Sequence, residues 1–386
     1  MNVHMVIGAG FGDEGKGTIT AEIASKNPLE TLVILNNGGA QRGHSVLHQG
    51  KVYNNKHFGS GSCFGSSSFF GPMFILDPMQ FTQEYTQNLM ETKPVIYRHV
   101  ACRWVTPFDI IANQSEAVLK EIHNTCGMGI WKTIQRYNMS TLQKAVGEAY
   151  YIKPFDNFME LPYEERVKYL NEIADWYKKH GSYTPEYNAF LEDPELRSGL
   201  IDHFIRDCEF MYNSTKAVGN YDFVKFYKTV IFENGQGLAI GDDGHDNVNK
   251  TPSYTGLKAL DSRLISHLGP FIESFTIHYV SRTYETRHGD DFHFKSVDRK
   301  KISSYIEEDA NNHYNQWQGE FKYGPLNNML LTQRILKDLK DLDPNIRERN
   351  ITRVILELTH CDEVSGEYIT CPGVDEIRCT GTAEVN

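Results

Sequence analysis

Residues 7–18 have the sequence Ile-Gly-Ala-Gly-Phe-Gly-Asp-Glu-Gly-Lys-Gly-Thr, which joins a short apolar run to a stretch of helical character. The apolar run covers residues 3–7 and the helical stretch covers residues 18–25. Gly10 to Lys16 has the spacing of a P-loop, in which backbone N–H groups at a helix N-terminus surround a phosphate. The sequence therefore predicts a strand, a phosphate-binding loop and a helix, in that order.

This loop differs from an ordinary P-loop in two ways. The Ser or Thr that normally follows the lysine is replaced by Gly17, and Thr18 comes one position later. An acidic pair, Asp13-Glu14, lies inside the loop, although backbone N–H groups alone can bind a phosphate. A carboxylate beside bound phosphates indicates a magnesium ligand, a catalytic base, or both.

The composition is that of a globular chain with one large or two ordinary domains. It has 386 residues, of which 40% are hydrophobic, and a net charge of −11. This acidic balance argues against a nucleic-acid polymer as partner, since a basic stripe would be expected for one. No apolar run approaches a membrane span, and no signal-peptide pattern begins the chain. The seven scattered cysteines include no C-x-x-C pair, so we expect a reduced, cytoplasmic protein without a membrane partner.

Short apolar runs alternate with helical patterns along the chain. The runs, which predict buried strands, are residues 3–7, 32–35, 229–232, 276–280 and 353–358. The helical patterns are residues 115–123, 163–178, 256–268 and 326–341. This alternation predicts an α/β fold with a P-loop-like, mostly parallel central sheet and helices on both faces. We expect residues 1–386 to form a single domain that carries a helical insertion, or subdomain, at about residues 150–225.

Polar segments follow the later strands, where parallel sheets bind their ligands. Gly38 to Ser45 contains an amide, a guanidinium and an imidazole, which suit a base edge, a phosphate and a proton transfer. Phe232 to Gly237 follows a strand in the same way. Taken singly, each segment could also be a surface turn with solvated side chains.

Three further segments have two interpretations each. Residues 242–245, Asp-Asp-Gly-His, are either a metal cluster or a solvated acidic turn, and we favour the turn because spacing alone does not bring oxygens together. Arg282 and Arg287 suit a substrate carboxylate or phosphate, or are ordinary surface charge. Asp362 follows the last strong strand and could bind a guanine edge or cap a helix.

Taken in order, these motifs resemble those of the adenylosuccinate synthetase family. Gly12 to Gly17 matches the family's G-D-E-G-K-G, Gly38 to Ser45 resembles G-G-H-N-A-G-H-T, and Phe232 to Gly237 resembles F-E-G-A-Q-G. Three shorter segments, Thr125–Ile130, Thr359–Asp362 and Cys379–Thr382, resemble T-T-G-R-G-I-G, T-K-x-D and S-T-G-P. The resemblance extends over the whole chain.

The resemblance implies a ligase that joins L-aspartate to position 6 of a purine nucleotide through a 6-phosphoryl intermediate, with a nucleoside triphosphate and Mg²⁺. Asp13 matches the family's base and magnesium ligand, His44 its acid, Lys16 its phosphate-binding lysine, and the Gly43 carbonyl its second magnesium ligand. The family's nucleotide- and substrate-binding positions fall on Gly12, Glu14, Gly15, Gly17, Thr18, Gln41, Arg42, Gly43, Cys126, Gly127, Gln236, Thr251, Arg282, Arg287, Thr359, Asp362, Thr380 and Gly381.

Departures from these motifs resemble the family's bacteriophage branch, which uses dGMP in place of IMP. The family's residues are replaced at Gln41, Arg42, Cys126 and Met128, and the basic loop at residues 281–289 is rewritten. That loop and residues 57–61 are similar to the phage branch, although many of its members have a serine where this chain has Asp13.

We therefore predict that dGMP, L-aspartate and ATP give 2-amino-2'-deoxyadenylosuccinate, a diaminopurine DNA precursor, in a host cytoplasm if the chain is phage-encoded. The alternative is ordinary adenylosuccinate synthesis from IMP with GTP, which Asp362 favours. An alternative of another class is a P-loop nucleotide-binding regulatory protein. The resemblance also implies a homodimer in which an arginine reaches the partner's nucleotide; Arg136 is a candidate, although its spacing from Cys126 differs from the family's.

Overall fold

The fold is taken from a computed structural model of the chain. It describes residues 1–88, 94–120, 125–145, 152–241, 251, 253–289, 294–309, 312, 314 and 316–381. The acidic segment at residues 242–245 lies outside the described residues, so its two interpretations stay open.

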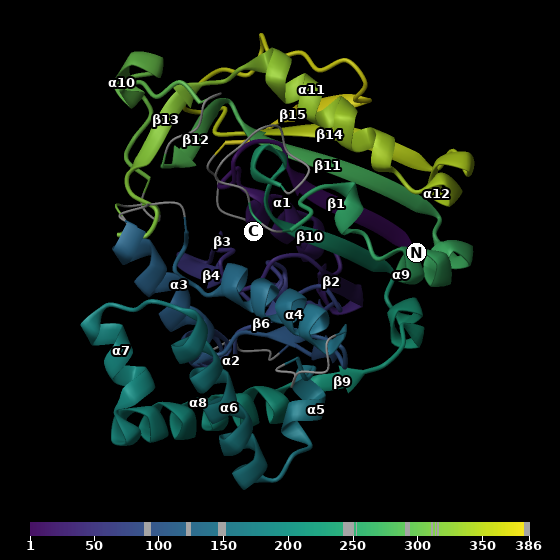
Figure 1. The fold of residues 1–386 in the computed structure, drawn as a ribbon. Coiled ribbons are helices and arrows are strands. Elements are labelled where there is room, and N and C mark those ends of the chain that lie inside the picture. Colours follow the sequence, from purple (N-terminus) through teal and green to yellow (C-terminus); the bar gives the residue numbers. More distant parts are fainter. Residues whose placement is uncertain are drawn as a thin grey trace.

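A nine-stranded sheet forms the centre of the described structure, and its neighbouring strands are all parallel (Figure 1). The five predicted strands are confirmed as β1, β2, β10, β11 and β14. The strand order is β15 (Glu376–Cys379), β14 (Thr352–Thr359), β11 (Ser274–Arg282), β1 (Asn2–Gly8), β10 (Thr229–Gly237), β2 (Thr31–Leu35), β5 (Ser67–Phe70), β7 (Ile96–His99) and β9 (Lys216–Val218).

Helices cover both faces of this sheet, as the sequence predicted. Along β1, Val6 packs on one face with Ile19 of α1 (Lys16–Ser25), whereas Met5 belongs to the core on the other face. This alternation places two apolar layers against one strand. The second core includes Leu264 of α9 (Ser262–Leu268), Leu331 of α11 (Asn328–Asp338) and Ile346 of α12 (Pro344–Glu348).

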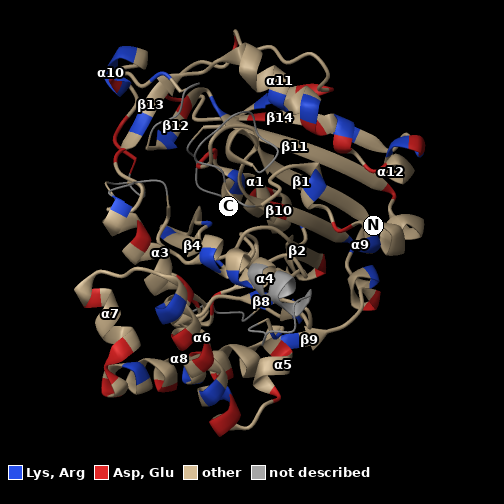
Figure 2. Ribbon diagram, viewed as in Figure 1, with Lys and Arg blue, Asp and Glu red and all other residues tan. Residues whose placement is uncertain are grey.

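The first core continues from α1 into a mainly helical region, which lies at the lower end of the molecule in Figure 1. Its helices are α2 (Pro78–Gln87), α3 (Pro107–Lys120), α4 (Ile130–Ala145), α5 (Phe155–Met159), α6 (Tyr163–His180), α7 (Pro185–Glu192) and α8 (Pro194–Ser214). Helices α5 to α8 occupy the stretch in which we expected a helical insertion; the single-domain organisation stays a prediction. Figure 2 shows Lys and Arg interspersed with Asp and Glu on α6 and α8.

Smaller elements complete the described fold. Three two-stranded pairs are β3 (His44–His48) with β4 (Lys51–Asn55), β6 (Ile75–Leu76) with β8 (Arg103–Trp104), and β12 (Tyr284–His288) with β13 (Phe321–Pro325). Short helices are α10 (Arg299–Ile302), η1 (Pro28–Glu30), η2 (Ser62–Phe64), η3 (Asp222–Phe226), η4 (Leu238–Ile240), η5 (Leu257–Ala259), η6 (Gly269–Phe271) and η7 (Leu339–Asp341). Within the described ranges, no helix is both long enough and apolar enough to cross a bilayer.

Two helix predictions need correction at their start. Helix α3 begins eight residues earlier than predicted, because Asp109 accepts hydrogen bonds from the backbone and hydroxyl of Thr106 at its N-terminus. The pattern at residues 256–268 gives only η5 and α9. The Ala259 carbonyl accepts from the side-chain amide of Asn36, and Asp261 caps the start of α9 by accepting from the Arg263 backbone N–H, so the helix begins again there.

Candidate active site

The predicted P-loop connects β1 to α1 through left-handed backbone. Gly12 and Gly15 have φ of 108° and 92°, and Asp13 between them has φ of 60°, which a residue with a side chain rarely adopts. The backbone carbonyl of Asp13 accepts a hydrogen bond of 2.7 Å from Arg282 Nε at the end of β11. A neighbouring strand therefore holds Asp13 in this strained conformation.

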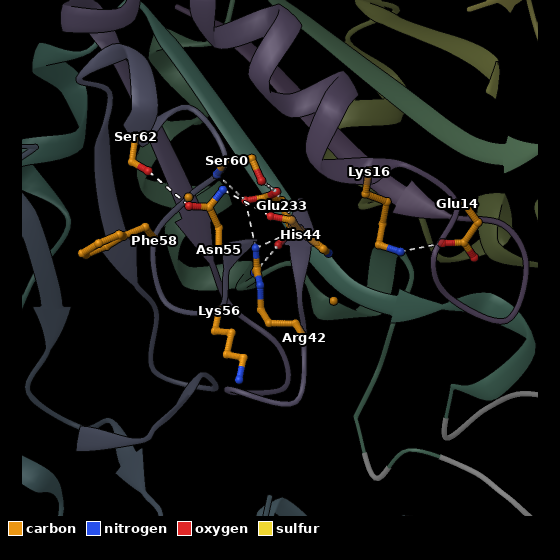
Figure 3. Close-up of polar contacts among 12 residues, drawn as sticks. Glu14, Lys16, Arg42, His44, Asn55, Lys56, Phe58, Ser60, Ser62 and Glu233 are labelled. Carbon is orange, nitrogen blue, oxygen red and sulfur yellow. Dashed lines mark hydrogen bonds and ion pairs between the residues drawn. The ribbon is translucent and has the colours of Figure 1, made fainter. Parts of the chain in front are cut away.

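The Glu14 carboxylate is turned into its own loop. It accepts hydrogen bonds from the backbone N–H groups of Gly10 and Gly12, at 3.0 and 2.8 Å, and from Lys16 Nζ at 2.5 Å (Figure 3). A phosphate in a P-loop uses donors of these types. In this structure Glu14 therefore stabilises the loop and satisfies the lysine, and its predicted contact with a nucleotide stays a prediction.

The Asp13 carboxyl lies among opposing influences on its pKa. Burial raises the pKa of its carboxyl, and the nearby charges of Arg282 and Lys16 oppose that rise. The predicted substrate contact of Arg282 needs correction. Its guanidinium lies 2.7 Å from Asp309 and 3.2 Å from the Tyr284 hydroxyl, in addition to the Asp13 carbonyl, so it positions the loop instead.

A buried carboxylate on β10, Glu233, organises the second half of the site (Figure 3). His44 Nδ1 lies 2.6 Å from its Oε1, and Arg42 Nη2 lies 2.9 Å from its Oε2. The Ser60 backbone N–H donates to Oε2 at 3.0 Å, and the Ser60 hydroxyl donates to Oε1. We call these four residues the Glu233 cluster.

The charges in the Glu233 cluster follow from burial and pairing. Burial alone would raise the pKa of Glu233, but Arg42 and His44 lower it to about 2, so the carboxylate is ionised. Burial and the charge of Arg42 lower the pKa of His44 to about 4. Because an ionised carboxylate only accepts, we assign the Nδ1 proton of neutral His44 to the bond with Glu233. The predicted acid role would therefore use Nε2, which must first receive a proton.

Arg42 is a correction to the sequence analysis, which made it a nucleotide ligand. Its side chain is buried, and its two terminal nitrogens are bound to the Glu233 carboxylate and, at 3.1 Å, to the Glu233 backbone carbonyl. These two nitrogens compensate a buried charge and are not available to a phosphate, while Nε is buried without a hydrogen-bond partner in the described structure. Glu233 and Ser60 were missed as site residues, although Glu233 lies in the family-like segment 232–237 and Ser60 in the phage-like segment 57–61.

Close packing brings the Glu233 cluster against the P-loop. A side chain at Gly17 would place its Cβ 2.9 Å from the Cβ of His44 and 3.2 Å from the Ser60 hydroxyl. Only a glycine leaves room for this approach, which explains why the usual Ser or Thr is absent. Thr18 follows in the first turn of α1, half-buried. Lys16 and His44 are thereby neighbours, and the charge of Lys16 contributes to the lowered pKa of His44.

Two glutamines meet at the carboxyl ends of β2 and β10. Gln41 Nε2 and Gln236 Oε1 lie 3.0 and 3.2 Å from the position that a Cβ of Gly38 would occupy. Both amide atoms of Gln41 and the Oε1 of Gln236 are buried without a hydrogen-bond partner in the described structure. Buried amides without partners are rare, and they mark a place where a polar ligand can bind.

The predicted segment at residues 125–130 lies beside the loop that carries Gln41. Gly127 accepts a hydrogen bond from Gln114 Nε2 at 3.0 Å, and its Cα faces the Trp317 ring. Cys126 is half-buried next to it. Gly39 packs against the Ile130 side chain, so the two predicted substrate loops are in contact. Thr251 lies next to η4, because its backbone N–H donates to the carbonyl of Ile240 at 2.8 Å.

The end of β14 contacts the P-loop and carries the predicted base-recognition residues. The Thr359 hydroxyl donates to the Glu14 carbonyl at 2.8 Å, and its methyl group packs against Gly15. Asp362 is exposed, 3.2 Å from where a Cβ of Gly381 would lie, and the Thr380 carbonyl accepts from the Cys361 backbone N–H at 3.1 Å. The predicted residues Asp362, Thr380 and Gly381 are thus brought together.

Two arginines flank the aromatic residue of the P-loop. The guanidinium carbons of Arg287 and Arg334 lie 5.0 and 4.9 Å from the centre of the Phe11 ring. Phe11, Arg334, Gly12 and Glu14 also line a small cavity beside the loop. The predicted substrate residue Arg287 is therefore next to the P-loop.

The candidate role of Arg136 in a partner subunit also needs correction. Arg136 lies fully buried inside the helical region, where its Nε is 2.9 Å from Asp109 and its Nη2 donates to the Trp104 carbonyl at 3.0 Å. The Tyr177 hydroxyl donates to the same Asp109 at 2.6 Å. Arg136 stabilises the packing of α3, α4 and α6 and is too enclosed to reach another subunit.

A metal at this site would depend on substrate oxygens. Among the residues that the structure describes, no three His, Cys, Asp or Glu side chains converge in a way that could hold an ion. Asp13 supplies one carboxylate, and Gly43 is exposed with no atom within 4 Å of the place where its Cβ would be. Mg²⁺ often binds through one carboxylate together with phosphate oxygens, so this donor set fits it.

Comparisons with known proteins give one consistent result. A family model described as adenylosuccinate synthetase matches residues 5–313. The adenylosuccinate synthetase of Clostridium botulinum (strain Alaska E43) is 24% identical over 301 residues, covering 75% of this chain and 64% of that protein. The enzyme of Borrelia duttonii is 26% identical over 295 residues, covering 70% and 64%. The chain spans about 64% of the length of these curated relatives.

Two solved structures share the fold. The fully ligated adenylosuccinate synthetase of Plasmodium falciparum has a TM-score of 0.64 at 17% identity, covering 95% of this chain and 78% of that one. The succinoaminodeoxyadenylate synthetase of cyanophage S-2L, bound to dGMP and dATP, has a TM-score of 0.56 at 12% identity, covering 92% and 84%. At these identities the likeness is one of fold.

We predict that Glu233→Gln lowers the free energy of unfolding by about 3 kcal/mol at pH 7, because it leaves the Arg42 charge buried without compensation. Urea unfolding measures this. The contribution of Glu233 is fully present above its ordinary pKa and is lost as the pH falls toward about 2, so the difference between wild type and variant shrinks on acidification.

The matched control is Glu209→Gln. Glu209 also forms an ion pair of 2.8 Å, with Arg166, but its side chain is 45% exposed. We expect a loss below about 1 kcal/mol there. Equal losses in the two variants would contradict the role given to Glu233.

Proposed function

The chain belongs to the adenylosuccinate synthetase family, and we propose that it is a ligase that joins L-aspartate to position 6 of a purine monophosphate, using a nucleoside triphosphate. The observation that carries the proposal is Asp13. It is a carboxylate with a raised pKa inside a phosphate-binding loop, held in strained backbone by Arg282. Phosphate binding alone does not need such a group, whereas removal of a purine N1 proton does.

The first step is phosphorylation of the purine 6-oxygen. Asp13 accepts the N1 proton, and the 6-oxygen then attacks the γ-phosphorus while the nucleoside diphosphate leaves. Lys16 and the N-terminus of α1 bind the transferred phosphoryl group, for which Lys16 must exchange its bond to Glu14 for a bond to phosphate. His44 lies next to Lys16 and, with a proton on Nε2, would donate to the 6-oxygen.

The second step forms the C–N bond. The amine of L-aspartate attacks carbon 6, and the carbon–oxygen bond to the phosphorylated oxygen breaks. Inorganic phosphate leaves with the electron pair of that bond, and the amine loses one proton to the phosphate or to water. Arg287, beside the P-loop, would bind the aspartate carboxylates. Asp13 and the Gly43 carbonyl would hold Mg²⁺, which neutralises phosphate charge when bound.

For the substrates we propose dGMP, L-aspartate and ATP, which give 2-amino-2'-deoxyadenylosuccinate. The phage-like loops at residues 57–61 and 281–289 support dGMP. The side-chain amide of Gln41 and the Oε1 of Gln236, which are buried without hydrogen-bond partners in the described structure, offer a donor and acceptors to a polar purine edge. The cyanophage enzyme that shares the fold binds dGMP and dATP, which supports the proposal at the level of fold analogy.

The competing substrate pair is IMP with GTP. The exposed Asp362 carboxylate, next to Gly381, is the observation that favours GTP, because it could accept two hydrogen bonds from guanine. Against this, His360 stands where the family motif has a lysine, and burial together with Arg282 lowers its pKa to about 3, so it is uncharged. We also propose a homodimer, in which the residue that reaches the partner is not Arg136.

The proposal is tested by measuring phosphate release with dGMP, dIMP, GMP and IMP, each with ATP or GTP and with or without L-aspartate. We expect aspartate-dependent release with dGMP and ATP. Turnover with IMP and GTP alone would keep the ligase chemistry and overturn the proposed substrates. Phosphate release that does not depend on L-aspartate, or no phosphate release with any pair of nucleotides, would overturn the proposed ligase activity.

We predict that Asp13→Asn lowers kcat by at least about 10³-fold, because the amide has the same shape but does not accept the N1 proton. Isothermal calorimetry should still detect monophosphate binding. The control, Asp175→Asn, changes an exposed carboxylate on α6 and should retain activity. Turnover near the wild-type rate in Asp13→Asn would remove Asp13 from the mechanism.

We predict that Asp362→Asn leaves kcat/KM for ATP within about twofold, since adenine does not offer the two N–H donors that a carboxylate accepts. Any use of GTP should fall by about tenfold. Steady-state kinetics with both triphosphates measures the two effects. A variant in which neither changes would show that Asp362 does not contact a base.

A further inference from the structure

Two cysteines lie side by side at the carboxyl ends of β14 and β15. Cys379 is the last residue of β15 and pairs in register with Leu358 of β14. The backbone N–H of Cys361, just beyond β14, donates to the Thr380 carbonyl at 3.1 Å. Parallel pairing thus continues past the strand ends and holds the two cysteine-bearing segments against each other.

The two sulfurs point to the same place. The position that a Cβ of Gly366 would occupy lies 3.0 Å from Cys379 Sγ and 3.5 Å from Cys361 Sγ, so the missing side chain of Gly366 leaves room where the thiols meet. Burial and then interaction with the Cys379 thiol raise the pKa of Cys361 to about 12. Cys379 is exposed and Cys361 is half-buried. An accessible thiol therefore contacts a more protected one.

We propose that Cys361 and Cys379 form a dithiol site that peroxide oxidises reversibly to a disulfide. The exposed Cys379 thiolate attacks hydrogen peroxide, the O–O bond breaks, and a sulfenic acid forms with release of water. The Cys361 thiol then attacks that sulfur, the S–S bond forms, and a second water leaves. Two thiols thus lose two electrons and two protons, which reduce one peroxide to two waters.

The position of the pair gives the oxidation a consequence, and this part rests on the proposed function. Asp362 directly follows Cys361, and Thr380 directly follows Cys379, so each cysteine adjoins one side of the candidate base site. A disulfide requires a sulfur–sulfur distance of about 2.05 Å, which draws the two segments together and moves Asp362 relative to Gly381. We expect oxidation to raise KM for the triphosphate by about fivefold or more and to leave KM for aspartate unchanged.

The 386-residue chain is treated with hydrogen peroxide and analysed by intact mass and peptide mapping. We expect the loss of two hydrogen atoms, a linked peptide that contains Cys361 and Cys379, and full reversal by dithiothreitol. Cys361→Ser and Cys379→Ser should each lack this species. Cys371→Ser, which changes a buried thiol in the same C-terminal region, should still form it.

The outcomes separate the site from its effect. Oxidation of Cys379 alone to sulfinic acid, a disulfide between two chains, or no change at either thiol would overturn the dithiol site. A linked peptide with an unchanged KM for the triphosphate would overturn the effect on the base site and leave the dithiol standing. An absence of ligase activity bears on the proposed function only, since mass spectrometry detects the disulfide without turnover.

Discussion

A fully buried, ionised carboxylate at Glu233 sets the arrangement of the candidate site. A carboxylate without compensation would be costly in the interior, so the chain must supply donors around it. It does so from two separate segments: the stretch after β2, which carries Arg42 and then His44 at the start of β3, and the loop before β5, which carries Ser60. Since both oxygens of the carboxylate are bound by these donors, the segments that carry the donors have little freedom to move apart. The orientation of His44, and with it the nitrogen available to a substrate, follows from this charge compensation.

The same rule operates in the P-loop on a smaller scale. Lys16 is buried, and its charge is balanced by Glu14, two residues away, while the Glu14 carboxylate also satisfies two backbone N–H groups. Arg282 compensates Asp309 and holds the Asp13 carbonyl. Lys16 and His44, two groups that could act on a substrate, are thus paired before a substrate arrives. Such pairing keeps the site ordered, and it means that a ligand must compete with a protein group for Lys16.

The sequence was sufficient for the centre of the fold and insufficient for its charge pairs. The strand before Gly8, the glycine-rich loop and the helix from Lys16 were predictable, because apolar runs and glycine spacing are local signals. Strands β5, β7, β9 and β15 were missed because they have three or four residues each. Arg42 was assigned to a ligand, and Arg136 was considered for one, because an arginine's sequence neighbours do not indicate its partner. Glu233 and Asp109, 191 and 27 residues away, are their partners. Gly17 was visible in the sequence as a departure from the P-loop motif, but its reason was not. The reason is its close packing against His44, which only the structure shows.

The competition for Lys16 constrains how phosphate binding can be coupled to proton transfer. Glu14 and Asp13 are adjacent, so a phosphate that displaces the Glu14 carboxylate from Lys16 introduces negative charge close to Asp13. Negative charge nearby raises the pKa of a carboxylate, and a higher pKa makes it a stronger base. The phosphate alone would therefore increase the tendency of Asp13 to take a proton from the purine, whereas Mg²⁺ held by Asp13 would act in the opposite direction and limit that increase. A base outside the loop would not respond in this way, which is a physical reason for a carboxylate to lie inside a phosphate-binding loop.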